Sequence, residues 1–503
     1  MQLRDLLHVT RYHTVSGSLD RRITRLDYDV RRVLPGSLYF ALPGPPRDGH
    51  ERIALAVERG AVGVVCEHPG FCSPRSTVIR VPDARLALGQ VAAAFHRYPG
   101  RRLTVIVAAG GGHRVGAAYL TRQVLQAAGV AAGLVSSIRD EIGDHVFPAP
   151  AAGRESADVQ QQMARMVRAG CDACVLEEPP AAACLSEAAG VEFDLGLFVG
   201  GELDRSGGWR VGPGPGARGL PAMVSPRAKA KLGAAVFDAD DHESLALRRA
   251  ADARRCLTYG TSEAAHVRLL ARESSFNGTR LRVSLEGAEV VGNVPLFGEE
   301  ELRGLLAALA GALALGVPAA LLRRRLERIG PVPGRLEGLD CGQPFGVFVD
   351  RAESERTLEK ALRTLRRIAT GRVLVLCGCG AREDIGERAR VGEAAARLAD
   401  YTVVTSNNPG REAPDAVAGS TVRGYCAVRP NDFHVELDRR RAIDELIGQA
   451  ASGDTVLLAG KGHDAGEDCE DTRVTFDDRE YALESLARRG FTPGPGRGRG
   501  RTS

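Results

Sequence analysis

Residues 103–129 read LTVIVAAGGGHRVGAAYLTRQVLQAAG, and this stretch decides the fold class. It opens with a continuous apolar run, which is typical of a strand buried on both faces of a parallel sheet. Three glycines follow at once (Gly110, Gly111 and Gly112), and the residues from Val115 onward have the apolar spacing of a helix. A strand, a glycine-rich turn and a helix in this order predict an α/β domain with a mostly parallel sheet.

Short apolar runs of the same kind recur along the chain and alternate with helical segments. They lie at 173–176, 195–199, 233–237, 345–349, 373–377, 401–405 and 455–458. We expect the first three to extend the central sheet and the last four to form a doubly wound α/β domain. Upstream, a helical stretch at 53–59 and an apolar strand at 61–66 predict a smaller α/β unit.

The length of 503 residues corresponds to about three domains at roughly 150 residues each. We predict an N-terminal domain over 1–98, a central domain over 99–330 and a C-terminal domain over 331–490. The last residues, 491–503, read FTPGPGRGRGRTS, a low-complexity composition that predicts a disordered basic tail.

The overall charge is nearly balanced, with 67 Lys and Arg against 63 Asp and Glu. This balance gives no case for specific binding of nucleic acid. The odd count of 11 cysteines has no compact disulfide spacing, and the first dozen residues carry charges rather than a signal-peptide core. We therefore expect a cytoplasmic protein, and we interpret Cys171, Cys174, Cys377 and Cys379, which lie against buried strands, as structural rather than metal-binding.

One segment, 305–322, has no charge over eighteen residues and imitates a membrane span. It is rich in alanine rather than in large apolar residues, and Gly316 and Pro318 interrupt it. Because proline cannot donate a hydrogen bond inside a helix, we predict two buried helices here and no membrane span.

The glycine turn at 110–112 lies where a phosphate-binding loop belongs, because a helix N-terminus and backbone N–H groups favour anions. Such a loop also needs a lysine for the phosphates and a hydroxyl for Mg²⁺. The sequence has His113, Arg114 and Val115 instead. From local residues alone, a nucleotide site and a tight strand-to-helix turn both remain open.

Several segments resemble, in order, those of the Mur ligase family, in particular its ATP-dependent synthetases that add the third amino acid to a UDP-linked dipeptide. The segments run from LDYDVRRVLPGSLYFALPGPPRDGH to FDDRE and include the glycine turn. They are found at 26–50, 101–129, 225–232, 237–241, 332–337, 348–354, 376–384, 405–409, 457–463 and 476–480. The resemblance implies a three-domain Mur ligase architecture with a central P-loop-type, mostly parallel sheet and a C-terminal doubly wound α/β domain.

The resemblance also implies ATP and Mg²⁺ as cofactors and a UDP-N-acetylmuramoyl peptide as substrate, with an amide bond formed through an acyl phosphate. The family's nucleotide positions correspond here to Gly110, Gly111, Gly112, Arg114, Arg335 and Asp350. Its catalytic and Mg²⁺-holding positions correspond to Glu177 and to Lys229, a lysine that is carbamylated in the family. Its substrate positions correspond to Asp48, Gly49, His50, Asn408, Pro409, Gly460, Lys461, Gly462 and His463.

Several family positions carry a different residue type in this chain. The loop Gly-Lys-Thr is replaced by residues 113–115, and the acceptor signature Asp-Asn-Pro-Arg by 407–410, which read NNPG. The family's Tyr-Ala-His is replaced by 351–353, RAE, and an asparagine by Glu301. Losing several charge contacts together, each commonly worth a factor of about 10² to 10³ in rate, predicts a catalytically impaired or inactive member.

Three functions are consistent with these residues. The first is a pseudoenzyme that binds a cell-wall precursor or pairs with an active ligase. The second is an active ligase in which Arg114 replaces the lysine and the glycine turn supplies the phosphate-binding N–H groups. The third is an interaction scaffold that binds through the Gly-rich segment 200–225 and the basic tail.

Overall fold

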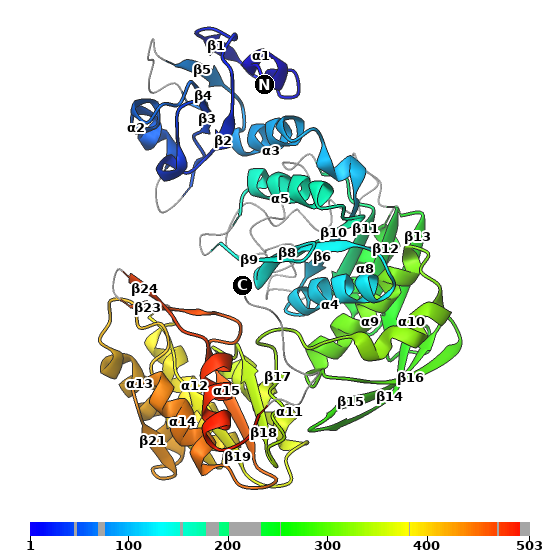
Figure 1. Ribbon diagram of the computed structural model, residues 1–503, viewed down its shortest axis with the longest axis vertical. Helices are drawn as coiled ribbons and strands as arrows, with labels where there is room; N and C mark the ends of the chain where they lie inside the picture. Colours follow the sequence, from blue (N-terminus) through cyan, green and yellow to red (C-terminus); the bar gives the residue numbers. More distant parts are fainter. Residues whose placement is uncertain are drawn as a thin grey trace. The chain divides into compact units, whose positions relative to one another are not determined.

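The computed structural model describes residues 1–44, 48–68, 76–150, 154–177, 191–200, 233–251, 253–381, 383–469 and 472–492. The chain divides into two compact units (Figure 1). The first combines Met1–Ala265 with Ala307–Val317, and the second combines His266–Leu306 with Pro318–Ser503. The three-domain division at residues 98 and 330 stays a prediction.

The first unit begins with a five-stranded sheet of order β1-β5-β4-β3-β2, in which β1 is antiparallel to β5 and the other pairs are parallel. One apolar cluster packs α1 and α3 against this sheet, and a second packs α2 against its other side. The elements are α1 (Leu3–Leu7), β1 (Thr14–Ser16), β2 (Arg25–Asp27), β3 (Ser37–Phe40), α2 (Ile53–Glu58), β4 (Gly63–Cys66), β5 (Thr77–Arg80) and α3 (Ala84–Phe95).

The second sheet of this unit has a parallel centre, β13-β12-β11-β6-β10-β7, and an antiparallel edge formed by β8 and β9. Its strands are β6 (Thr104–Gly110), β7 (Ala132–Val135), β8 (Arg139–Ile142), β9 (His145–Pro148), β10 (Ala173–Glu177), β11 (Leu195–Val199), β12 (Ala234–Asp238) and β13 (Arg255–Gly260). Its helices include α4 (Arg114–Ala127), α5 (Ser156–Arg168) and α8 (His242–Ala250). The predicted strand, glycine turn and helix are therefore confirmed as β6, 111–113 and α4.

The second unit contains an antiparallel meander and a parallel C-terminal sheet of order β17-β18-β22-β19-β20-β21 whose edge strand β17 alone runs antiparallel. The meander is β14 (Val267–Ser275), β15 (Gly278–Leu285) and β16 (Ala288–Val294). The C-terminal strands are β17 (Glu337–Gly338), β18 (Gly346–Asp350), β19 (Val373–Cys377), β20 (Tyr401–Val404), β21 (Phe433–Val435) and β22 (Thr455–Ala459), followed by a hairpin of β23 (Gly466–Cys469) and β24 (Thr472–Thr475).

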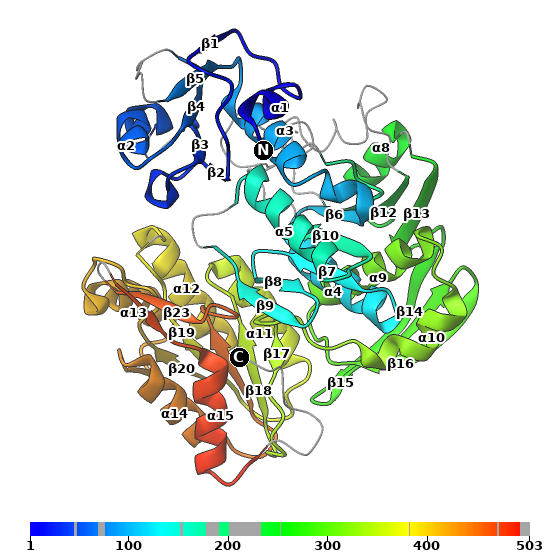
Figure 2. The same cartoon turned by 45° about the horizontal axis from the view of Figure 1, so that its top comes forward.

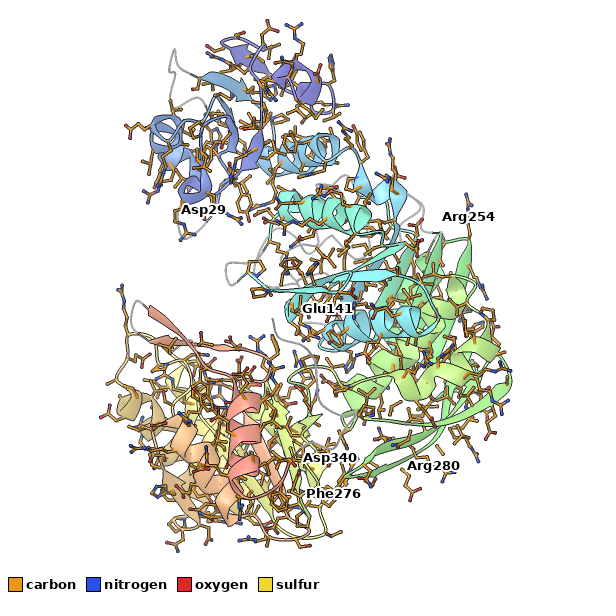
Figure 3. The ribbon with its side chains drawn as sticks, viewed as in Figure 1. Asp29, Glu141, Arg254, Phe276, Arg280 and Asp340 are labelled. Atoms are coloured by element: carbon orange, nitrogen blue, oxygen red, sulfur yellow. The ribbon has the colours of Figure 1, made fainter. Side chains whose placement is uncertain are left out.

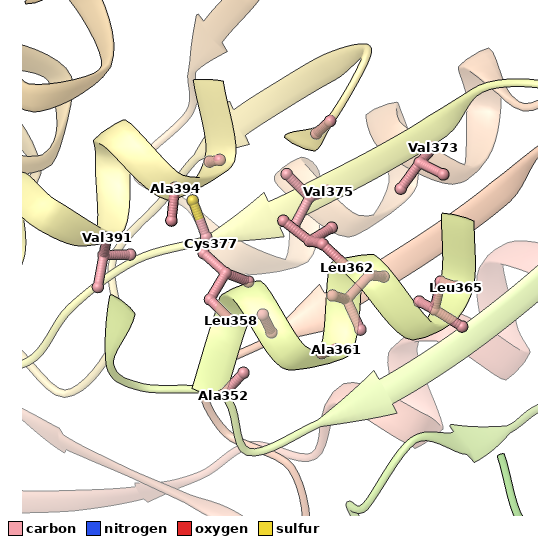
Figure 4. Packing of buried hydrophobic residues seen from close by; sticks show 14 of the residues in the cluster. Ala352, Leu358, Ala361, Leu362, Leu365, Val373, Val375, Cys377, Val391 and Ala394 are labelled. Carbon is pink, nitrogen blue, oxygen red and sulfur yellow. The ribbon is translucent and has the colours of Figure 1, made fainter. Parts of the chain in front are cut away.

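Helices cover both faces of this C-terminal sheet, as predicted for a doubly wound domain. Helices α11 (Glu355–Arg366), α12 (Ile385–Leu398) and α13 (Pro414–Val428) share one apolar cluster. Helices α14 (Arg439–Gln449) and α15 (Asp478–Arg488) share the cluster on the other face. Figure 4 shows Leu358 and Leu362 of α11 packed near Val375 and Cys377 of β19.

Two buried features support this domain. Arg439 and Asp478, 1% and 0% exposed, form a bidentate ion pair with nitrogen–oxygen distances of 2.7 Å, which joins the start of α14 to the start of α15. Burial raises the pKa of Cys377 and Cys379 to about 12, so these thiols stay protonated. Every cysteine whose side chain is described is free, and Cys171, Cys174, Cys377 and Cys379 are buried.

The uncharged segment 305–322 falls into α9 (Glu299–Ala314) and α10 (Ala319–Arg325), which confirms the predicted break into two helices. The predicted burial is wrong for α10, in which only Leu322 is buried. Gly316 adopts a left-handed φ of 89°, and Pro318 caps the start of α10. In the described part of the chain, no helix combines the length and the apolar character needed to cross a bilayer.

Candidate functional site

The glycine turn after β6 packs directly against the end of β11. Gly110 has a φ of +124°, and a Cβ added there would lie 2.7 Å from the carbonyl oxygen of Val199. The Gly111 N–H donates to the carbonyl oxygens of Val199 and Gly200, at 3.1 and 2.8 Å. One of the N–H groups expected to face a phosphate therefore points at the chain's own backbone.

Arg114, the first residue of α4, lies beside the carboxylate of Glu177. Its Nε is 3.4 Å from Glu177 Oε1, and the two side chains are 18% and 2% exposed. Its Nη1 also donates to the Gly111 carbonyl oxygen at 3.2 Å. The parallel pairing of β10 with β6 explains the proximity, because it sets Glu177 opposite Ala108, close to the turn. The structure thus brings together two predicted site residues, Arg114 and Glu177, as an ion pair.

The second carboxylate oxygen of Glu177 is held by the turn after β7. Both the backbone N–H and the hydroxyl of Ser137 donate to Glu177 Oε2, each at 2.7 Å. Sequence analysis did not single out Ser137, and its distance of forty residues from Glu177 in the chain left no local signal. Ser137 therefore fixes one oxygen of the carboxylate by hydrogen bonds, and Arg114 lies beside the other without hydrogen-bonding to it.

A buried charged network continues from this turn along β8. Glu141, labelled in Figure 3, pairs with Arg122 of α4 and with Arg139, whose Nε lies 2.7 Å from its Oε1. The neighbouring Asp140 accepts from Arg154 at 2.5 Å and from Gln162 at 2.7 Å, and burial raises its pKa. These contacts fix the Ser137 turn in place.

The residues around the turn do not fit magnesium-bound ATP. Such a site requires a lysine on the phosphates, a hydroxyl on the metal and an available carboxylate oxygen. The sequence from Gly110 to Gly116 has neither lysine nor hydroxyl. Ser137 holds Glu177 Oε2, and Oε1, which accepts no hydrogen bond from the described residues, faces the Arg114 guanidinium at 3.4 Å rather than a free position. The remaining predicted metal position, Lys229, lies outside the described residues.

The predicted substrate residues Asp48, Gly49 and His50 form a tightly bonded turn. His50 Nε2 accepts the Glu67 N–H at 3.0 Å, so Nδ1 carries the proton and donates to Asp48 Oδ1 at 2.7 Å. The Gly49 N–H donates to the Leu42 carbonyl oxygen at 2.9 Å. The backbone N–H of His50, together with its ring, lowers the pKa of Asp48. These side-chain contacts position the turn, and its contact with a precursor stays a prediction.

In the second unit, Arg335 and Asp350 share a buried cluster with Glu301. Asp350 Oδ2 accepts the Leu336 N–H at 2.7 Å. Burial raises the pKa of Asp350 to about 6, and Arg335 acts against this shift. Burial, together with the charges of Asp350 and Glu300, raises the pKa of Glu301 to about 8. The predicted nucleotide residue Arg335 thus lies beside the carboxyl groups of Asp350 and Glu301.

The turns after β20 and β22 meet through Lys461, which is 1% exposed. Its Nζ donates to the carbonyl oxygen of Gly466 at 3.0 Å and to Asn408 Oδ1 at 3.3 Å, and it lies 5.4 Å from the centre of the Phe476 ring. Gly460, with a φ of +115°, passes so close to Asn407 that a Cβ would lie 2.9 Å from Nδ2.

The remaining predicted residues of these turns also have backbone roles. The Glu412 N–H donates to the Pro409 carbonyl oxygen at 3.1 Å. Gly462 and His463 pack against Arg351 and Gly334, next to Arg335. The structure therefore brings the predicted substrate residues of the second unit together at one edge of its sheet.

Comparison with known proteins gives a consistent family. The protein-family model described as "Mur ligase, glutamate ligase domain" matches residues 334–462 of the chain. The chain is 34% identical to UDP-N-acetylmuramoyl-L-alanyl-D-glutamate--2,6-diaminopimelate ligase of Solibacter usitatus, over 93% of this chain and 94% of that protein. It is 33% identical to UDP-N-acetylmuramyl-tripeptide synthetase of Roseiflexus sp., over 92% of this chain and 94% of that protein.

Solved structures share the fold at lower sequence identity. A UDP-N-acetylmuramoyl-L-alanyl-D-glutamate--2,6-diaminopimelate ligase superposes with a TM-score of 0.66 at 20% identity, covering 98% of this chain and 100% of that chain. MurF ligase from Thermotoga maritima in complex with ADP superposes with a TM-score of 0.59 at 17% identity, covering 93% and 99%.

Proposed function

The chain belongs to the Mur ligase family, and from that premise we propose that it is a tripeptide-synthetase-like member in which ATP-driven ligation is lost or severely reduced. It acts by binding a UDP-N-acetylmuramoyl peptide or related cell-wall precursor, or by pairing with an active ligase, in the cytoplasm. The reaction that its relatives' names describe would require a cofactor site that the turn after β6 does not supply.

A single observation carries this proposal. The Arg114 guanidinium pairs with Glu177 at 3.4 Å, where the family would use that carboxylate to hold Mg²⁺. Ser137 holds the other oxygen at 2.7 Å. A magnesium ion at Glu177 would have to displace a cation built into the chain, and the phosphate oxygens would face a turn whose Gly111 N–H is already bound.

The electrostatics of the second unit support the same function. Arg335, at a nucleotide position of the family, is surrounded by Glu301, Asp350 and Glu353. Three carboxyl groups thus compete with a phosphate for one guanidinium, and each one that is ionised repels a triphosphate. The loss of cofactor binding is thus supported by two separate parts of the chain.

The test is titration calorimetry of the full chain with ATP plus Mg²⁺, and separately with UDP-N-acetylmuramoyl-L-alanyl-D-glutamate. We expect no saturable ATP binding in the micromolar range and retained binding of the precursor. Micromolar ATP binding accompanied by precursor-dependent phosphate release would overturn the proposal.

One observation favours the alternative of an active ligase with a rearranged loop. Arg114 keeps a positive charge at the start of α4, where phosphates bind in this family. This alternative predicts ATP binding that Arg114→Ala abolishes. Under our proposal the same substitution leaves the absent ATP binding unchanged and only destabilises the fold, because it leaves Glu177 buried without its cation.

A further inference from the structure

The first turn of α5 presents two carboxylates to the N-terminal sheet. The Tyr28 hydroxyl donates to Asp158, and Arg32 Nη1 lies 3.4 Å from Asp158 Oδ1. Arg85 makes a bidentate contact with Glu155, with Nε and Nη2 at 3.0 and 2.9 Å from its oxygens. Three donors from two segments of the chain, 28–32 and the start of α3, therefore contact one acidic helix start.

This helix start is itself suited to an anion. Helix α5 has thirteen residues, and its N-terminal N–H groups and macrodipole favour negative charge. Ser156, in the same turn, is 1% exposed, and its hydroxyl has no hydrogen-bond partner among the described residues. A buried hydroxyl without a partner marks a place where a further polar group can be accommodated.

An apolar core between α3 and α5 supports the contact of Glu155 and Asp158 with the N-terminal sheet. Ala157 of α5 belongs to the apolar cluster that contains Leu88 and Val91 of α3, and Figures 1 and 2 show the two helices side by side. Burial and the Asp158 charge both raise the pKa of Tyr28, so its hydroxyl remains a donor at neutral pH. Burial thus holds the Tyr28 hydroxyl, whereas the Arg32 and Arg85 side chains are 58% and 45% exposed and remain accessible to a ligand from solution.

We infer that Glu155 and Asp158 act as an internal anion that occupies the donor set of Tyr28, Arg32 and Arg85 and excludes the diphosphate of a nucleotide-linked ligand from it. This autoinhibitory contact rests on the proposed function, because Tyr28 and Arg32 lie in the segment 26–50 that resembles the precursor-binding domain. Ligand and carboxylates compete for the same three donors, so precursor binding requires the first turn of α5 to withdraw.

The test is the double substitution Glu155→Gln and Asp158→Asn in the full chain. The amides keep the oxygens that form the capping box of α5 but lose the charge. We expect UDP-N-acetylmuramoyl-L-alanyl-D-glutamate to bind at least tenfold more tightly in calorimetry. Adding Arg85→Gln to this background should reverse the gain, because the ligand then loses a donor. Inorganic pyrophosphate as a second probe separates recognition of the diphosphate from recognition of the uridine.

Asp144→Asn serves as the matched control, because it removes one carboxylate in the exposed β8–β9 turn and should leave affinity unchanged. Hydrogen exchange at 28–32 and 84–88 reports whether the contact has opened. Faster exchange without tighter binding of either probe would overturn the inference. An ATP titration of the same variants tests the proposed function separately, because the contact does not involve the Arg114 turn.

Discussion

The turn after β6 and the turn after β22 are both glycine-rich and both follow a parallel strand. In each turn one position has no room for a side chain. A Cβ at Gly110 would clash with Val199, and a Cβ at Gly460 would clash with Asn407. The first turn has lost its lysine and pairs Arg114 with Glu177. The second turn has kept its lysine, Lys461, but has buried it. The glycines in a turn therefore indicate where the backbone passes close to a neighbour. The binding properties of the turn depend instead on the contacts that its charged side chains make.

The largest expected effect is on the first turn. Gly110→Ala should lower the free energy of unfolding by about 2–4 kcal/mol, because a Cβ would meet two carbonyl oxygens at a φ of +124°. Urea unfolding measures this difference. Gly116→Ala in α4 is the control, since nothing lies within 4 Å of its added Cβ, and helix propensity should raise stability by up to about 1 kcal/mol. Equal effects of the two substitutions would contradict the steric account.

The second turn should respond to the loss of its buried cation. Lys461→Met should cost about 1–3 kcal/mol of unfolding free energy, because the Gly466 carbonyl oxygen and Asn408 Oδ1 lose a donor. Lys360→Met is the matched control: its Nζ pairs with Glu300 at 2.8 Å in a largely exposed setting, and the expected cost is at most about 1 kcal/mol. A smaller effect at Lys461 than at Lys360 would show that the buried lysine is not structural.

The carboxyl cluster near the second turn predicts a pH dependence. The pKa of Glu301 is about 8 in the folded protein against an ordinary 4.5, so the folded state holds a proton that the unfolded chain releases. Stability should therefore fall as pH rises from 5 to 8, by at most about 1.4 kcal/mol per pH unit. Glu301→Gln should flatten this fall, as thermal melts at several pH values would measure. An unchanged slope would assign the dependence to other groups.

The smallest expected effect is a change in ATP binding when the family's side chains are restored in the first turn. Arg114→Lys combined with Val115→Thr restores the family's side chains but should not produce measurable ATP binding, because Ser137 still holds Glu177 and Gly111 still bonds to Gly200. Calorimetry with ATP and Mg²⁺ checks this. Saturable binding by the double variant would show that two side chains alone separate this chain from a nucleotide-binding loop.

The buried strands were predictable because each is a continuous apolar run between turn residues. The runs at 173–176 and 373–377 correspond to β10 and β19 almost residue for residue. The antiparallel strands β8, β9 and β14 to β16 escaped prediction, because strands such as Val267–Ser275 carry alternating or charged residues and lack an apolar run. The parallel strand β7 is buried but has only four residues, and it was not predicted either. Sequence patterns thus identify the strands that are buried on both faces better than those at the edges.

The candidate site was predictable in its members but not in their partners. Arg114 and Glu177 were both identified by resemblance, yet their pairing depends on the register of β10 against β6. The contact of Tyr28 with Asp158 joins residues 130 positions apart, and no local pattern encodes it. The burial of Lys461 similarly depends on a carbonyl oxygen and a neighbouring turn, which a sequence motif does not specify.

The chain passes between its two compact units after Ala265, after Leu306 and after Val317. Each unit therefore consists of two separate stretches of sequence, and no single continuous fragment contains one whole unit without part of the other. A fragment ending at Val317 would carry the strands β14 to β16 without the rest of their unit. A fragment starting at Pro318 would lack those strands and the first half of α9. For the same reason, replacing one whole unit by that of a relative requires three junctions in the chain rather than one.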